Sequence, residues 1–315
     1  MNNSGFEALA LEVFKYQAQN NTVYKAYLQV LGKDQEMVTS LSAIPFLPIS
    51  FYKSHQVKTG EFAVQEIFES SGTTRSISSR HFVKDLSLYE GSFIKGFALF
   101  YGPVKNYCIL GLLPSYLERK KSSLVYMVDK LIQLSEHPQS GFYLNEYEQL
   151  AAVLQELEKR KQPTLLIGAT FALLDFAEKF SFPLRHTIMM ETGGMKGRRE
   201  EMIRAEVHDV LEKAFHMSVI HSEYGMTELL SQAWSKADGI FNCPPWMKVL
   251  MRDDEDPFMI KNIGSGTINV VDLVNIHSCS FIATDDVGKL YPDGRFEVLG
   301  RMDGSDLRGC SLMVL

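Results

Sequence analysis

The stretch Glu69-Ser70-Ser71-Gly72-Thr73-Thr74-Arg75 places four hydroxyl groups and one glycine in five consecutive positions, after a mostly apolar segment at residues 62–68. Glycine permits a tight turn with positive φ and lets a ligand approach the backbone closely. Successive backbone N–H groups in such a turn form a concavity that binds anions, and hydroxyl groups add rotatable donors. The stretch therefore predicts a loop that holds a triphosphate. The alternative is a solvent-exposed turn rich in Ser and Thr.

The composition is typical of a soluble globular protein. A chain of 315 residues with 45% hydrophobic and 22% charged residues can bury one large α/β core or two subdomains. A net charge of −6 argues against a nucleic-acid-binding surface. The four cysteines are widely spaced, which favours reduced thiols, and no signal peptide is apparent. The most apolar region, 93–117, is interrupted by lysine and proline, so we expect a cytoplasmic protein without a membrane span.

The hydrophobic pattern predicts alternating strands and helices. Apolar runs at 164–168 and 187–190 are typical of buried strands, and each precedes a segment with helical periodicity. The predicted elements are helices at 4–31, 171–180 and 197–215, the start of a helix within 78–88, and strands at 164–168, 187–190 and 218–220. This order indicates βαβ units and a mainly parallel sheet flanked by helices.

The pattern changes after residue 248. Short apolar runs at 267–271 and 280–283, separated by polar residues, predict a smaller antiparallel sheet. The predicted fold class is therefore α/β with an additional β-rich subdomain. We expect an α/β region over residues 1–242 and the smaller subdomain over residues 243–315, with a boundary near the Asn242-Cys243-Pro244-Pro245 segment.

Three predicted strand ends carry unusual side chains. They are Glu191-Thr192-Gly193-Gly194, Glu223-Tyr224-Gly225-Met226-Thr227-Glu228 and Thr284-Asp285-Asp286. In open α/β sheets, ligands bind beyond the carboxyl ends of the strands. The second segment could stack a base, contact a phosphate and hold Mg²⁺, which prefers oxygen ligands. Taken singly, each segment could also be an ordinary turn.

Taken together and in this order, the segments resemble the adenylate-forming superfamily of acyl-CoA synthetases and related ligases. That family has a Ser/Thr/Gly phosphate loop, then Tyr-Gly-x-Thr-Glu, a ribose-binding Thr-Gly-Asp segment and Gly-Arg-x-Asp at a hinge. The matching segments here begin at Ser70, Tyr224, Thr284 and Gly300 and span about three-quarters of the chain. The resemblance implies ATP and Mg²⁺ as cofactors and the family's large-domain fold.

The resemblance also implies roles for single residues. Glu228 would bind Mg²⁺ and Thr227 would contact a phosphate, while Asp286 and Arg301 would bind the ribose. Gly193 and Gly194 would form the turn beside the adenine, near Tyr224 and Gly225. The phosphate contacts would come from Ser70, Ser71, Gly72, Thr73 and Thr74.

The chain departs from the superfamily pattern at four points. Arg75 and Asp285 replace glycines, and Ser78 stands where the family often has lysine. Only 315 − 303 = 12 residues follow Asp303, so we expect the small lysine-bearing C-terminal domain to be absent. The tail from Gly300 to Leu312 and the segment from Pro48 to His55 resemble LuxE-type acyl-protein synthetases. By that resemblance, Cys310 would accept the acyl group, with packing of a terminal strand as its alternative role.

The leading hypothesis is ATP-dependent activation of a carboxylic acid, expected to be a fatty acid, to acyl-AMP. The acyl group would then move to a thiol, either that of Cys310 or that of coenzyme A or an acyl carrier protein. The rival hypothesis is a non-catalytic nucleotide- or acyl-binding subunit of an acyl-transfer or reductase complex, with a partner reductase. The changes at Arg75 and Ser78 motivate the rival.

Overall fold

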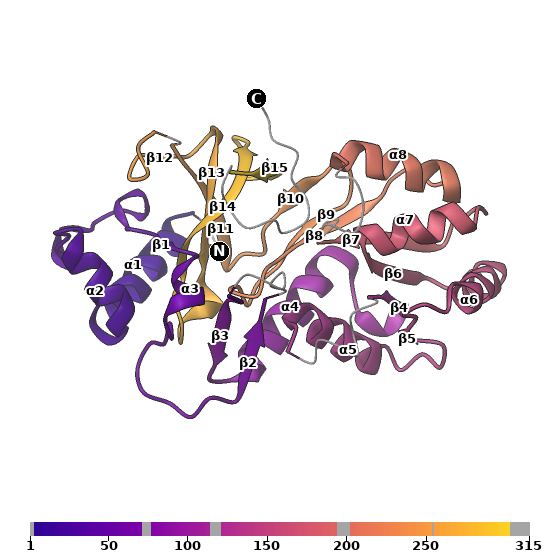
Figure 1. The fold of residues 1–315 in the computed structure, drawn as a ribbon, viewed down its shortest axis with the longest axis horizontal. Helices are drawn as coiled ribbons and strands as arrows, with labels where there is room; N and C mark the ends of the chain where they lie inside the picture. The colour runs from indigo at the N-terminus through magenta and orange to yellow at the C-terminus, as the bar shows by residue number, and fades with distance from the viewer. Residues whose placement is uncertain (1–2, 71–76, 114–120, 194–201, 254, 303–315) are drawn as a thin grey trace. The chain divides into compact units, whose positions relative to one another are not determined.

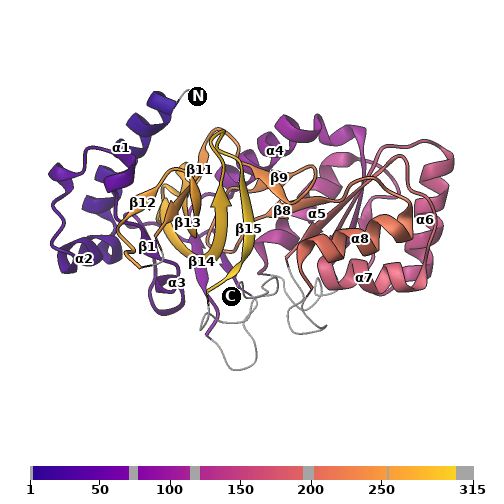
Figure 2. The same cartoon turned by 90° about the horizontal axis from the view of Figure 1, so that it is seen from above.

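The computed structural model describes residues 3–70, 77–113, 121–193, 202–253 and 255–302. Its chain divides into two compact units, each discontinuous in sequence (Figures 1 and 2). Of the described residues, unit 1 contains 3–70, 77–92, 226–232, 242–253 and 255–302, and unit 2 contains 93–113, 121–193, 202–225 and 233–241. The chain passes from unit 2 to unit 1 after Phe241. The division into 1–242 and 243–315 stays a prediction.

Unit 2 contains a mainly parallel sheet with the strand order β9-β8-β7-β6-β4-β5. Its strands are β4 (Cys108–Leu112), β5 (Gly141–Phe142), β6 (Thr164–Ala169), β7 (Thr187–Thr192), β8 (His221–Tyr224) and β9 (Ala233–Ser235). Every residue of β4 and β6 is buried, as expected for parallel strands covered on both faces. Only β9 runs antiparallel to its neighbour in this set.

Helices cover both faces of this sheet. They are α5 (Ser123–Ser135), α6 (Tyr147–Lys159), α7 (Thr170–Lys179) and α8 (Arg204–Phe215). Right-handed crossovers place α7 and α8 on one face and α5 on the other, as Figure 1 shows. The order of the strands reverses between β4 and β6, because β5 adds on one side of β4 and β6 on the other. Such a reversal opens a crevice at the carboxyl ends of the two strands, where ligands bind in this class of sheet.

Unit 1 contains an antiparallel sheet with the order β12-β11-β13-β14-β15, and a short strand β1 lies parallel to β14. The strands are β1 (Leu47–Pro48), β11 (Met247–Arg252), β12 (Ile260–Lys261), β13 (Gly264–Asp272), β14 (Phe281–Leu290) and β15 (Phe296–Arg301). A separate hairpin is formed by β2 (Glu66–Glu69) and β3 (Arg80–Val83). Unit 1 also contains the helices α1 (Asn3–Asn20), α2 (Thr22–Val30) and α3 (Phe51–Ser54). Helix α4 (Leu86–Tyr101) and strand β10 (Ile240–Asn242) each include residues of both units.

The N-terminal helices of unit 1 are fixed to the segment before β14 by buried amides. Gln17 Nε2 donates to Asn275 O at 3.0 Å, and Gln17 Oε1 accepts from Ser280 N at 2.9 Å. Asn21 Nδ2 donates to Ser278 O at 2.8 Å. Both amides are fully buried, and these bonds offset the cost of removing their polar groups from water.

The predicted α/β class is confirmed, with a mainly parallel sheet in unit 2 and an antiparallel sheet in unit 1. Two of the predicted elements are wrong. Residues 80–83 form strand β3 rather than the start of a helix, and α4 begins at Leu86. The strand expected at 218–220 lies at His221–Tyr224 instead. No helix in the described part of the chain has the length and apolar character needed to cross a bilayer.

Candidate functional site

The predicted phosphate loop joins β2 to β3 in unit 1. At its base, Ser70 N donates to Ser79 O at 3.0 Å, and Ser79 N donates to Ser70 Oγ at 2.9 Å. Ser79 is fully buried, so both ends of the loop are fixed on the hairpin. Four of the residues expected to contact phosphate lie outside the described residues: Ser71, Gly72, Thr73 and Thr74. Their role stays a prediction.

His81 links this hairpin to the segment that carries Thr227. The imidazole is buried, and its Nδ1 lies 2.9 Å from the backbone oxygen of Thr227. Burial lowers the pKa of His81, which favours the neutral ring. Because a carbonyl oxygen can only accept, Nδ1 carries the hydrogen and donates it. Strand β3 therefore positions the backbone of Thr227 next to the base of the loop.

The residues after Thr227 are held by β13. One oxygen of the Asp272 carboxyl accepts from the backbone N–H groups of Leu230 and Ser231, each at 2.9 Å. The other oxygen accepts from Ser231 Oγ at 2.6 Å. Burial raises the pKa of Asp272 to about 6, against the opposing effect of these hydrogen bonds. The turn that carries Thr227 and Glu228 is thus anchored from both sides.

Glu228 lies within this anchored turn. Its side chain is fully buried, and its backbone oxygen accepts from Asn275 Nδ2 at 2.8 Å. Within the described ranges, no cluster of three or more His, Cys, Asp or Glu residues could hold a metal ion. A single carboxylate nevertheless fits Mg²⁺ that arrives with a nucleotide, because Mg²⁺ is commonly held by one or two carboxylates together with substrate phosphates and water. The role of Glu228 as a magnesium ligand stays a prediction.

The two residues predicted to bind ribose are partners in the antiparallel sheet. Asp286 on β14 lies opposite Arg301 on β15, and Arg301 Nε lies 3.0 Å from Asp286 Oδ1. Asp286 is buried, and its backbone N–H donates to Thr284 Oγ1 at 3.2 Å. The structure thus brings this predicted pair together, and its ribose-binding role stays a prediction.

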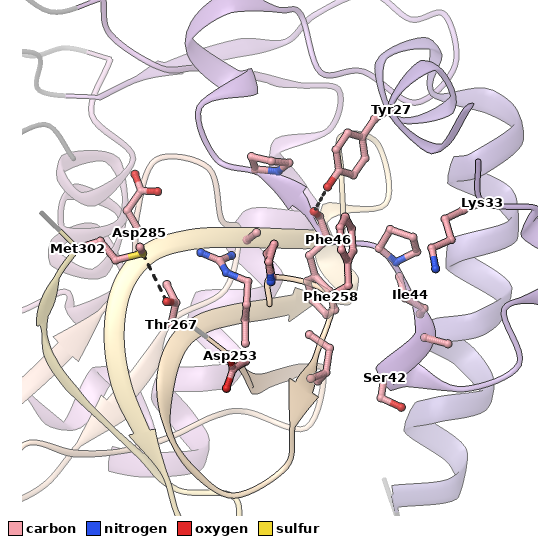
Figure 3. A pocket seen from close by; sticks show the side chains of 17 residues that line it. Tyr27, Lys33, Ser42, Ile44, Phe46, Asp253, Phe258, Thr267, Asp285 and Met302 are labelled. Carbon is pink, nitrogen blue, oxygen red and sulfur yellow. Dashed lines mark hydrogen bonds between the residues drawn. The ribbon is translucent and has the colours of Figure 1, made fainter. Parts of the chain in front are cut away.

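A cavity of about 490 Å³ lies on unit 1 beside the same strands (Figure 3). Aromatic rings of Tyr27, Phe46 and Phe258 contribute to its wall, together with Asp285 and Met302. Since successive side chains of a strand point to opposite faces, Asp285 lines this cavity while Asp286 points to the other face of the sheet. The aspartate that replaces a family glycine therefore does not join the Asp286–Arg301 pair.

The remaining predicted nucleotide-binding residues belong to unit 2. Gly193 follows β7 with φ of 64°, in the left-handed region that favours glycine. Tyr224 ends β8, is buried, and its ring lies 5.9 Å from that of Phe241. Gly225 is exposed, and Gly194 lies outside the described residues. Because β7 and β8 are parallel neighbours, Gly193 and Tyr224 leave the sheet at the same edge.

The described cysteines are poor nucleophiles. Burial raises the pKa of Cys108 to about 11 and the pKa values of Cys243 and Cys279 to about 12. A thiol attacks as its thiolate, so a raised pKa leaves little of the reactive form near neutral pH at the buried Cys108 and Cys279 and at the half-buried Cys243. Cys310, the predicted acyl acceptor, lies outside the described residues.

Sequence reasoning missed His81 and Asp272, which position the Thr227–Glu228 turn. His81 carries no metal-ligand spacing, and Asp272 ends a strand without any recognisable motif. His81 contacts a residue 146 positions away along the chain, and Asp272 contacts residues 41 and 42 positions away. No local sequence pattern could therefore have indicated these two positioning residues.

Comparison with known proteins gives one family and several similar folds. The family described as acyl-protein synthetase, LuxE, matches residues 2–315. No sequence among curated proteins matches the chain. The ATP-bound crystal structure of MatB from Rhodopseudomonas palustris is 15% identical, with a TM-score of 0.57, over 76% of this chain and 48% of MatB.

Two further solved structures have a similar fold. O-succinylbenzoate coenzyme A synthetase (MenE) from Bacillus subtilis, in complex with ATP and magnesium, is 16% identical with a TM-score of 0.53, over 78% of this chain and 52% of MenE. The luciferase-like enzyme from the mealworm Zophobas morio is 15% identical with a TM-score of 0.52, over 86% of this chain and 61% of that enzyme. The chain thus spans about half the length of the first structures that it matches. At these identities the likeness shows the fold, which is that of adenylate-forming enzymes.

Proposed function

Because the chain belongs to the LuxE acyl-protein synthetase family over residues 2–315, we propose that it activates a carboxylic acid with ATP and transfers the acyl group to a thiol. The observation that carries the proposal is the 2.9 Å contact between His81 and the backbone of Thr227. It places the hairpin of the phosphate loop next to the turn that carries Glu228. MatB and MenE, which share the fold, have been solved with ATP, and MenE also with magnesium.

The residues have distinct roles in this proposal. Unit 1 supplies the phosphate loop from Ser70 to Thr74, the phosphate contact of Thr227, the magnesium ligand Glu228, and the ribose-binding pair of Asp286 and Arg301. Unit 2 supplies the turn at Gly193 and Gly194 and the aromatic ring of Tyr224, followed by Gly225, for the adenine. Mg²⁺ supplies positive charge to the phosphate oxygens when it is bound with ATP.

The first step forms acyl-AMP. A carboxylate oxygen of the acid attacks the α-phosphorus of ATP, the bond from that phosphorus to the bridging oxygen breaks, and pyrophosphate leaves with the bonding electron pair. The protein contributes by holding the two reactants in line and by placing donors where negative charge develops.

The second step moves the acyl group to a thiol. The thiolate attacks the carbonyl carbon of acyl-AMP, a C–S bond forms, the C–O bond to the phosphate breaks, and AMP leaves. We propose Cys310 as this thiol, with coenzyme A or an acyl carrier protein as other possible acceptors. A fatty acid is the proposed substrate, and a partner reductase could consume the thioester.

Exchange of labelled pyrophosphate into ATP tests the first step. We expect exchange that depends on both Mg²⁺ and an added acid, measured across short, long and aromatic carboxylic acids. A complete lack of exchange with every acid would favour the rival function, a nucleotide- or acyl-binding subunit, which the serine at position 78 supports.

The variant Cys310→Ser tests the second step. We expect it to retain pyrophosphate exchange but to lose the hydroxylamine-sensitive label that the wild-type chain acquires from radioactive acid and ATP. Cys243→Ser is the matched control, because burial keeps that thiol protonated, and it should label like the wild type. Equal labelling of Cys310→Ser and wild type would exclude Cys310 as the acceptor.

A further inference from the structure

A buried ion pair lies where β7 of unit 2 ends. Arg204 Nε, in the first turn of α8, lies 3.0 Å from Glu191 Oε1 on β7. The Glu191 side chain is only 3% exposed and that of Arg204 20%. Glu191 begins the Glu191–Gly194 strand end but has no role assigned to it, and Arg204 belongs to none of the three strand ends. A buried ion pair is costly to maintain unless its geometry and remaining hydrogen bonds are good.

The carboxylate of Glu191 is well satisfied. Its Oε2 accepts from Thr170 Oγ1 at 3.1 Å, and His208 Nε2 on α8 lies 3.8 Å from Oε1. Burial acts to raise the pKa of Glu191, but the Arg204 guanidinium and the hydrogen bonds of His208 and Ser222 outweigh it and hold the pKa at about 2. The pair is therefore ionised over the whole physiological range.

One branch of contacts leads from this pair to the turn at Gly193. Thr170 follows β6, at the carboxyl edge where the strand order reverses. Its Oγ1 lies 3.1 Å from Glu191 Oε2 and 2.8 Å from the backbone oxygen of Gly193. The hydroxyl has one hydrogen, which the two acceptors share, and Thr170 thus connects the charged carboxylate to the backbone of the turn.

A second branch leads to Tyr224. The Arg204 guanidinium lies over the ring of Phe241, 5.1 Å from its centroid, and that ring lies 5.9 Å from the ring of Tyr224. Gly239 leaves room for this arrangement, because a Cβ there would lie 2.9 Å from Arg204 Cδ. A guanidinium is planar and stacks on an aromatic face, whereas an ammonium group is a point charge.

We propose that Arg204 and Glu191 are positioning residues that hold the Gly193 turn and the Tyr224 ring in the geometry that receives a purine base. The inference rests on the proposed function, since it assigns the base-binding role to Gly193 and Tyr224. Arg204 and Glu191 act through Phe241 and Thr170, and neither contacts the base. Their effect is therefore confined to the base and does not extend to the phosphates.

The test compares binding of ATP with binding of inorganic tripolyphosphate, both with Mg²⁺, by titration calorimetry. Arg204→Lys keeps the positive charge beside Glu191 but removes the flat group above Phe241. We expect its affinity for ATP to fall by about tenfold, the scale of one stacked base, while its affinity for tripolyphosphate stays within twofold of wild type. Lys213→Gln, which removes an exposed ion pair with Asp209 on the same helix, is the control and should match wild type for both.

Glu191→Gln provides a second variant that keeps the size of the side chain and removes its charge. It should show the same selective loss for ATP. Equal ATP affinity in wild type and in both variants would overturn the positioning role and leave the proposed function intact. Equal losses for ATP and tripolyphosphate would also overturn it, since they would indicate general damage. If wild type itself failed to bind ATP, the proposed function would fail, and this inference with it.

Discussion

In the described part of each unit lies a buried arginine–carboxylate pair with an N–O distance of 3.0 Å, and the two pairs differ in how they could be found. Asp286 and Arg301 lie opposite each other on neighbouring strands and belong to motifs that the sequence displays. Glu191 and Arg204 lie on a strand and the following helix, and no motif marks them as a pair. The comparison teaches that motifs reveal the residues that we propose to contact a ligand more readily than the residues that we propose to hold those contacts in place.

The largest expected effect is the destabilisation caused by Arg204→Ala. This change leaves the Glu191 carboxylate buried without its cation, and breaking a buried pair in this way costs about 3–5 kcal/mol. We expect the free energy of unfolding, measured by urea denaturation, to fall by that amount. The control Lys213→Ala removes half of an exposed pair and should cost about 0.5 kcal/mol or less.

A small loss in the free energy of unfolding of Arg204→Ala would contradict the stabilising role of the Glu191–Arg204 pair. A loss below about 1 kcal/mol would mean that water or another cation reaches Glu191, and that the pair does not stabilise unit 2. The double variant of Arg204→Ala with Glu191→Gln tests whether the loss of stability comes from the unpaired charge of Glu191. Because the amide carries no charge, we expect it to recover part of the stability lost in Arg204→Ala.

Much of the parallel sheet could be predicted because its signals are local. The runs that became β6 and β7 contain at least three consecutive apolar residues, and buried parallel strands are rich in such runs. The strands β3 and β8 could not be predicted in the same way. Their sequences, Arg-His-Phe-Val and His-Ser-Glu-Tyr, are largely polar, and their extended form depends on pairing with β2 and with β7.

The residues of the candidate site also fall into those that local sequence motifs indicate and those that only the fold reveals. The Asp286–Arg301 pair could be predicted from the order of motifs along the chain. The positioning role of His81 could not be predicted, because it depends on one hydrogen bond to a backbone atom 146 residues away along the chain. Arg204 likewise lies in a segment with ordinary helical periodicity, and only the fold shows that its guanidinium covers Phe241.

The second prediction concerns the pair that we propose to contact ATP directly. Arg301→Lys keeps a cation next to Asp286, so the free energy of unfolding should change little. If Arg301 donates hydrogen bonds to the ribose, the change should weaken ATP binding by about 1.5–3 kcal/mol, the scale of a hydrogen bond from a charged group. Titration calorimetry with ATP measures this loss, which should exceed that of Arg204→Lys.

The reverse order would contradict our assignment of the two pairs. If Arg204→Lys weakened ATP binding more than Arg301→Lys, then Arg204 rather than Arg301 would be the residue closer to the nucleotide. Adenosine alone provides the control ligand, because it retains the base and the ribose and lacks the phosphates. Both variants should lose affinity for it.

The smallest expected effect concerns Glu223, a second buried glutamate at the same edge of unit 2. Its carboxyl accepts a hydrogen bond from Thr192 Oγ1 at 2.5 Å, and its register partner on β9 is Trp234. Among the described residues, no basic side chain forms an ion pair with it. Burial, together with the charge of Glu191, raises the pKa of Glu223 to about 7, although the Thr192 hydrogen bond opposes this. Glu191 and Glu223 thus lie on adjacent strands with pKa values shifted in opposite directions.

These shifts predict opposite dependences of stability on pH. Glu223 binds its proton more tightly in the folded state, so stability falls as pH rises from about 4.5 to about 7 and stays lower above that range. Glu191 is the reverse case, and its contribution to stability is present above about pH 4.5 and is lost as pH falls toward 2.

Glu223→Gln cannot ionise, so we expect it to be more stable than wild type by about 1–2 kcal/mol at pH 8 and nearly equal at pH 5. Glu191→Gln should instead be less stable than wild type at pH 8, and urea denaturation at the two pH values separates the cases. A Glu223→Gln variant that showed no gain at pH 8 would mean that Glu223 is already ionised and paired in the fold, and the contrast between the two neighbouring carboxyls would then not exist.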